Sequence, residues 1–177
     1  RGQYERLDAQ RLAMQTGAEE SMLRCHAMWG EMGLKPEPGF EEVGFNLVGR
    51  KDAFEAKLAS LSTERAKRVQ DVRGAARTAA ALLEELEVDV SQREFDRAIA
   101  SPDERALGLS KEVMDAISLR TLELQKIRDE RTELLKSLGM RIQPLWERLG
   151  VSPAERQAFF ERNSGMGDRV VAACEAE

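Results

Sequence analysis

The residues that could do chemistry are few. The chain has one histidine, His26, and two cysteines, Cys25 and Cys174. Cys25 and His26 are neighbours in a segment with helical periodicity, so their side chains point about 100° apart around the helix axis. A metal site needs several such groups converging on one point, and a catalytic Ser–His or Cys–His pair would depend on this single histidine. We therefore predict no metal centre, no catalytic residues and no enzyme activity.

Loops that hold phosphate groups are also missing from the sequence. Neither a G-x-x-x-x-G-K-[ST] run nor a G-x-G-x-x-G run occurs, and the nearest glycine cluster is SGMGD at residues 164–168. That cluster lacks a preceding strand and a lysine, so it indicates a turn between helices. Acidic pairs such as Glu84–Glu85 have no catalytic partner nearby. We expect no cofactor and no ligand pocket.

The charge balance restricts the partners. The formal net charge is -5 and the estimated pI is about 5.2, so the chain lacks the positive field that draws proteins to nucleic acids or anionic membranes. The basic run at residues 64–68 is interleaved with acidic residues and contains no aromatic residue, which favours a solvated helix face. We predict no nucleic-acid and no membrane partner. Two distant cysteines without C-x-x-C spacing fit a reducing, cytoplasmic compartment.

The elements that carry these residues are predicted to be helical almost throughout. Ala, Leu, Glu, Arg and Lys dominate, and aromatic residues make up only 5%, a balance that suits long two-faced helices. We predict an all-α, elongated rod of long antiparallel helices, coiled-coil-like hairpins with short helical junctions. The expected segments are a first rod helix at 1–34, a loop at 35–49, a long helical hairpin at 50–151 with a short-helix connection at about 90–108, and a short helix followed by the start of another rod helix at 152–177.

Each expected helix end carries a similar group of apolar residues. A bulky, bulky, aliphatic spacing recurs at Trp29, Leu83 and Trp146, and the last copy runs into a serine and a glutamate spaced as a capping box. Ser91–Glu94 and Ser101–Glu104 have the same S-x-x-E form. The seam arginines Arg65 and Arg68 weaken a heptad seam unless their heads reach solvent. The predicted structural junctions are Trp29, Met32, Leu83, Leu86, Trp146, Leu149, Ser152 and Glu155.

The C-terminal stretch resembles a known family. Residues 140–177 read MRIQPLWERLGVSPAERQAFFERNSGMGDRVVAACEAE, which is similar to the antiparallel microtubule cross-linkers: protein regulator of cytokinesis, anaphase spindle elongation protein and the plant bundling microtubule-associated proteins. The resemblance rests on an I-x-x-L-W-x-x-L run followed by E-R-x-x-F. The matching residues are Ile142, Leu145, Trp146, Leu149, Glu155, Arg156 and Phe159.

The resemblance implies a helical spacer between a dimerisation hairpin and a domain that grips the microtubule lattice. It implies microtubules as a partner through parts outside this segment, self-association as a homodimer, and a place in the cytoplasm and cytoskeleton: spindle midzone, phragmoplast or axoneme. Both ends of the chain read as helix, so we expect a segment of a longer protein. The alternative is a coiled-coil scaffold of a cytoskeletal or ciliary (axonemal) complex that docks other cytoskeletal proteins.

Overall fold

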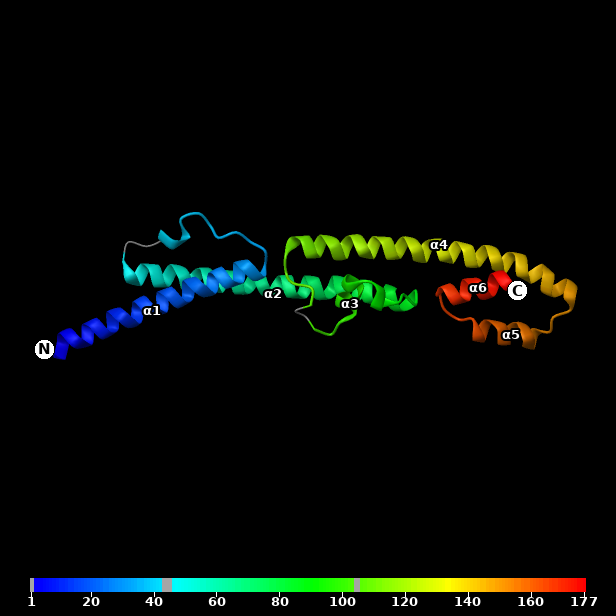
Figure 1. Ribbon diagram of the computed structural model, residues 1–177, viewed down its shortest axis with the longest axis horizontal. Coiled ribbons are helices and arrows are strands. Elements are labelled where there is room, and N and C mark those ends of the chain that lie inside the picture. Colours follow the sequence, from blue (N-terminus) through cyan, green and yellow to red (C-terminus); the bar gives the residue numbers. More distant parts are fainter. Residues whose placement is uncertain (1, 43–45, 104–105) are drawn as a thin grey trace. The chain divides into compact units, whose positions relative to one another are not determined.

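The computed structural model describes residues 2–42, 46–103 and 106–177, and these residues form helices without any strand (Figure 1). The all-α prediction is confirmed. Two short 3-10 turns, at Phe40–Glu42 and Val90–Gln92, separate some of the helices. The α-helices are α1 (Gly2–Glu31), α2 (Leu47–Glu85), α3 (Glu94–Ala100), α4 (Lys111–Leu149), α5 (Pro153–Arg162) and α6 (Asp168–Ala176).

Helices α2 and α4 dominate the fold. Each has 39 residues, which gives a length of about 58 Å at 1.5 Å per residue. Helix α2 begins at Leu47, three residues earlier than the sequence predicts. The reason is Asn46, whose side-chain oxygen accepts the backbone N–H of Gly49 at 2.7 Å, as an N-cap residue does.

The chain divides into two compact units, and both long helices pass from one unit into the other. The first unit contains residues 1–73 and 108–114, and the second contains residues 74–107 and 115–177. In the first unit α1 packs on the first part of α2 around Phe54, a fully buried side chain. Phe40 from the intervening turn lies 4.9 Å from the Phe54 ring and completes an aromatic group with Trp29.

Helices α1 and α2 run in the same direction (Figure 1). So do α2 and α4, because Arg68 of α2 bonds Leu109 just before α4 and Arg131 further along α4 bonds Leu86 just after α2. This differs from the antiparallel pairing, with a hairpin at 50–151, that the sequence predicts. The Cys25 thiol meets the Phe54 carbonyl, and further along both helices Met28 is paired with Ser62 and Glu31 with Arg65. The residue numbers of the paired positions therefore rise together along α1 and α2, as they do in parallel helices. The segment that joins the two helices is long enough to return the chain from the end of α1 to the start of α2, because an extended residue spans roughly 3.3 Å.

In the second unit α4, α5 and α6 form a small three-helix array. The chain reverses after α4, so that α5 runs antiparallel to it, and reverses again into α6 (Figure 1). Asp168 at the start of α6 pairs with Arg131, and Glu177 after its end accepts from the Trp146 indole at 2.7 Å. The core of this array consists of Leu138, Ile142, Trp146 and Phe159.

Candidate functional site

Three helices, α1, α2 and α4, end in the same backbone arrangement. In each, one amide reaches back five residues to a carbonyl: Leu34 to Trp29 (2.8 Å), Val88 to Leu83 (2.9 Å) and Val151 to Trp146 (3.0 Å). The preceding amide reaches back three residues: Gly33 to Gly30 (3.1 Å), Glu87 to Glu84 (3.0 Å) and Gly150 to Glu147 (3.4 Å). This pair of bonds is the Schellman motif, which satisfies carbonyls that a helix end leaves without partners. The apolar repeat seen in the sequence coincides with these three ends.

The Schellman motif requires a left-handed residue just past each helix. Gly33 and Gly150 supply it at two ends, with φ of 65° and 70°. At the end of α2 the residue is Glu87, with φ of 53°, and it is the only non-glycine residue with positive φ among the described positions. An L-residue in this conformation costs roughly 1 kcal/mol. The α2 end therefore carries a strain that the other two ends avoid.

The predicted junction residues mostly lie in the interior. Trp29, Met32, Leu83, Leu86 and Trp146 are buried, with at most 5% of their surface exposed. Leu149 differs, because 77% of its surface is exposed. At this end Val151 packs on the core instead of Leu149. Whether these residues act as joints that resist bending stays a prediction.

At two of these ends, those of α1 and α2, an arginine from another helix binds the carbonyl of the residue that follows the helix. Arg68 donates to the Met32 carbonyl at 2.9 Å and to the Leu109 carbonyl at 3.3 Å. Arg131 donates to the Leu86 carbonyl at 3.0 Å and to the Met166 carbonyl at 2.7 Å. A cation is favourable there because carbonyl dipoles point out of a helix C-terminus.

The end of α4 differs, because Arg156 donates from Nε to the carbonyl of Val151, which lies beyond the last helical residue, at 3.0 Å. Sequence reasoning treated the seam arginines as weak points, whereas Arg68 acts as a tie between segments. Arg65, its neighbour on the seam, forms a two-pronged ion pair with Glu31 at 2.7 and 2.8 Å. The signal in the sequence was the position of these arginines on an otherwise apolar seam.

A buried ion pair joins α3 to α4. Arg120 donates to both carboxylate oxygens of Asp96, at 2.8 and 2.7 Å, and also to Glu123. Only 1% of Asp96 is exposed. The hydrogen bonds that Arg120 donates to Asp96 raise the pKa of Arg120 above its ordinary value. Removing one partner would leave a buried charge alone, which is costly.

The capping box predicted at the start of α5 is present. Ser152 Oγ accepts from the Glu155 amide at 3.3 Å, and a Glu155 carboxylate oxygen accepts from the Ser152 amide at 2.8 Å. The backbone hydrogen bond from Ser152 lowers the pKa of Glu155.

The capping box expected at Ser91–Glu94 is absent. Asp89 accepts from the Ser91 amide instead, which begins a 3-10 turn, and α3 starts after Arg93 without a side-chain cap. The other expected box includes Glu104, which lies outside the described residues. Asp168 is the first residue of α6 and pairs with Arg131.

The chemically reactive residues are dispersed. The Cys25 thiol is fully buried, and burial raises its pKa. His26 lies 3.2 Å from a Glu41 carboxylate oxygen and meets the Trp29 ring edge-on. In the described ranges, no three His, Cys, Asp or Glu side chains are placed to hold a metal ion. None of the helices described there has an apolar stretch long enough to cross a membrane.

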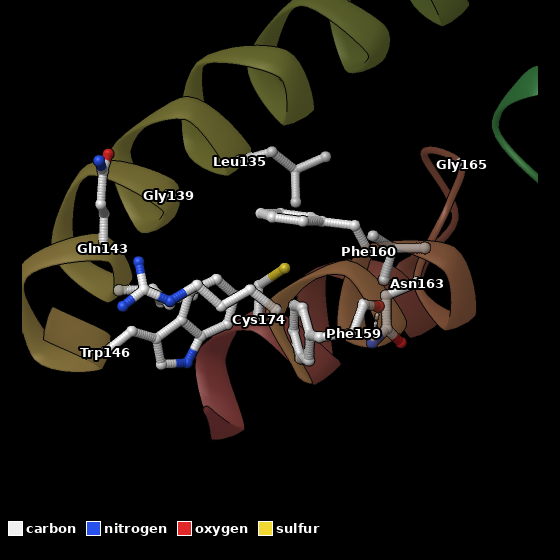
Figure 2. A pocket seen from close by; sticks show the side chains of 12 residues that line it. Leu135, Gly139, Gln143, Trp146, Phe159, Phe160, Asn163, Gly165 and Cys174 are labelled. Carbon is white, nitrogen blue, oxygen red and sulfur yellow. Dashed lines mark hydrogen bonds between the residues drawn. The ribbon is translucent and has the colours of Figure 1, made fainter. Parts of the chain in front are cut away.

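An apolar pocket of about 530 Å³ lies between α4, α5 and α6, which differs from the expectation of no ligand pocket. Figure 2 shows Leu135 and Trp146 from α4 facing Phe159 and Phe160 from α5 across this space. The rings of Phe159 and Phe160 both approach the Trp146 ring edge-on, at 5.5 and 5.6 Å. Periodicity alone could not reveal the pocket, because it depends on how closely three separate helices approach.

One cation borders this pocket. Arg156 lies over the Trp146 ring at 5.8 Å, within the range of a cation–π contact. Its Nε is used by the Val151 carbonyl, and in the part of the chain that the structure describes no carboxylate pairs with it. The pocket therefore combines an aromatic lining with a positive charge at its border.

The described residues form long helices, and side chains bind the carbonyls at two of the helix ends. In a comparison with protein families, the model described as Microtubule associated protein (MAP65/ASE1 family) matches residues 38–177. This range is well over half of the chain, so the chain belongs to that family of microtubule-associated proteins. The predicted resemblance is confirmed. No curated protein and no solved structure matches the chain.

Proposed function

We propose that this chain is the spacer segment of a protein that cross-links or bundles microtubules. Membership of the MAP65/ASE1 family supports a microtubule-associated role. The observation that carries the spacer role is the length of α2 and α4, which have 39 residues each. A long helix bends sharply only at features that interrupt its hydrogen-bond ladder, such as Pro144 within α4.

The tied helix ends support the same role. At the Schellman motifs after α1 and α2 an arginine binds the carbonyl that follows the helix, so fraying of those ends would break charge-assisted hydrogen bonds as well as apolar contacts. A mechanical load along the chain would therefore act on helix ends that resist fraying. In this proposal microtubules are gripped by parts outside the chain, the complete protein acts as a homodimer, and it works in the cytoplasmic cytoskeleton at a spindle midzone, phragmoplast or axoneme.

Sedimentation with stabilised microtubules tests the first half of this proposal. The chain alone should remain in the supernatant at physiological salt. A fusion that carries one microtubule-binding domain at each end of the chain should sediment and bundle the filaments. Sedimentation of the isolated chain would mean that it binds the lattice itself, and the spacer proposal would then be wrong.

The distance between bundled filaments tests the second half. In the same fusion, Arg77→Pro places a helix breaker on an exposed position of α2, at a cost of about 3 kcal/mol. The spacing seen by electron microscopy should then become broader, whereas Arg77→Ala should leave it unchanged. Equal spacing distributions for the two variants would contradict a strut built on α2.

The second candidate function is a scaffold of a cytoskeletal or axonemal complex, and the pocket in the second unit favours it. A pure spacer has no need of an open apolar pocket bordered by a cation. Charge reversals on the polar helix faces distinguish the two roles. A scaffold should lose recruitment of a folded partner, while a spacer should keep its filament spacing.

A further inference from the structure

The pocket between α4, α5 and α6 has the form of a groove along α4. Its α4 lining recurs at steps of four, three and four residues, from Leu135 through Gly139 and Ile142 to Trp146. Eleven residues of helix correspond to about 16 Å, or three turns. A trough of this length fits the apolar face of another short helix, as in helix-in-groove recognition. A compact small molecule would occupy only part of it.

The groove is open where a partner would enter. Gly139 borders it, and a Cβ atom added there would meet no atom within 4 Å. Phe160 borders it as well, although 57% of its surface is exposed, so an aromatic ring is left with one face uncovered. Deeper in the groove Trp146 and Phe159 are buried. The groove thus has an apolar floor and one uncovered aromatic side.

The positive charge of Arg156 at the groove favours a partner with a negatively charged residue. Arg156 has no carboxylate partner among the described residues, and it lies over Trp146 at the groove. Arginine prefers a carboxylate in a two-pronged, charge-assisted hydrogen bond. An acidic residue one helical turn from an apolar anchor would reach it while the anchor fills the groove.

We propose that this groove docks a short amphipathic helix from a partner protein, with a bulky apolar side chain in the pocket and a carboxylate on Arg156. The docking site is independent of the spacer role. If the spacer proposal failed, the groove would still bind such a helix, and a groove without a partner would not affect filament spacing.

Selection from a displayed library of 14-residue helical peptides tests the proposal directly. The whole 177-residue chain serves as bait, and Gly139→Phe serves for counter-selection because its ring would occupy the groove. The matched control is Gly139→Ala, which leaves the groove open. Selected peptides should share an apolar anchor with Asp or Glu three or four residues away. Their affinity should fall at least tenfold on Gly139→Phe and stay unchanged on Gly139→Ala.

A double-mutant cycle tests the contact with Arg156. Arg156→Gln should weaken a selected peptide about tenfold, and replacing the peptide's acidic residue by its amide should weaken binding to the wild-type chain equally. The amide peptide should then lose little more on Arg156→Gln, because both changes remove the same contact. Circular dichroism and the Trp146 fluorescence report whether each variant keeps its fold.

Three outcomes would overturn the proposal. The first is that no peptide is enriched over the counter-selection. The second is that the enriched peptides lack an acidic residue or bind Gly139→Phe equally well. The third is that a small aromatic acid, 1-naphthoate, binds in the groove while no peptide does, which would assign the site to small molecules.

Discussion

At the scale of single residues, the glycines and Glu87 show how the backbone decides what a position tolerates. Gly139 lies within α4, where a side chain would meet open space, and Gly150 lies just past α4 with φ of 70°. Both are glycines in the same stretch of chain. The first costs helix stability, whereas the second is required by the Schellman motif.

We therefore expect opposite effects from the same substitution at these two glycines. Gly139→Ala should raise the free energy of unfolding by up to about 1 kcal/mol, because alanine has the higher helix propensity. Gly150→Ala should lower it by about 1 kcal/mol, because alanine resists the left-handed region. Urea denaturation followed by circular dichroism measures both. Equal effects of the two changes would contradict the assigned backbone conformations.

Glu87 allows a second prediction at this scale. Glu87→Gly should stabilise the protein by about 0.5–1 kcal/mol, since glycine adopts the left-handed conformation without strain. Glu87→Val should destabilise it, because a β-branched residue is the least suited to positive φ. Thermal unfolding of the two variants beside the wild type provides the measurement. If valine were tolerated as well as glycine, the end of α2 would have a different geometry.

At the scale of elements, the start of α5 is held by side chains whose protonation matters. Glu155 has a lowered pKa in the folded chain because of its bond to the Ser152 backbone. A carboxyl whose folded pKa lies below its unfolded value contributes stability above the unfolded value and loses it as the pH falls through the folded pKa. The box therefore contributes fully at neutral pH and weakens in acid.

We predict that Ser152→Ala costs about 1 kcal/mol at pH 7, the usual value of an N-cap. Glu155→Gln should be less stable than the wild type at pH 7, and the difference should shrink as the pH falls below roughly 4. Urea denaturation at a series of pH values gives both quantities. A difference between wild type and Glu155→Gln that stayed constant down to pH 3 would mean that the carboxylate has no part in the box.

At the scale of the whole molecule, the fold joins two compact units through shared helices. Helices α2 and α4 each supply residues to both units. Trp29 lies in the first unit and Trp146 in the second, so each indole reports on one unit. The chain thus provides its own pair of probes for how far a local defect spreads.

The Asp96–Arg120 pair is the contact through which to introduce such a defect. Asp96→Ala leaves the partly buried Arg120 guanidinium without its main partner, and we expect a loss of about 3 kcal/mol in the second unit. Denaturation of a Trp29→Phe background, in which Trp146 is the remaining indole, measures it. The paired change Asp96→Leu with Arg120→Leu should recover most of the loss, because no charge is left buried. A loss of the same size in both variants would point to packing instead of charge.

Local patterns in the sequence determined the helices and the places where they end. The capping box at Ser152 and the apolar spacing at Trp29, Leu83 and Trp146 act through residues three to five positions apart, so they can be recognised without a fold. The family resemblance rested on the same local residues around Trp146. These effects act between residues that are close in the sequence, so a single sequence is enough to predict them.

Only the tertiary structure decided which segments pair, in which direction, and what the charged residues do. A heptad seam describes one helix and is equally satisfied by a parallel or an antiparallel neighbour, so α1 beside α2 could not be oriented beforehand. The Met32 carbonyl that Arg68 binds lies 36 residues away in the sequence, and the Leu86 carbonyl that Arg131 binds lies 45 residues away. The groove at Trp146 exists only where three helices meet. Contacts over such separations depend on the folded chain, because nothing in the local sequence specifies the partner.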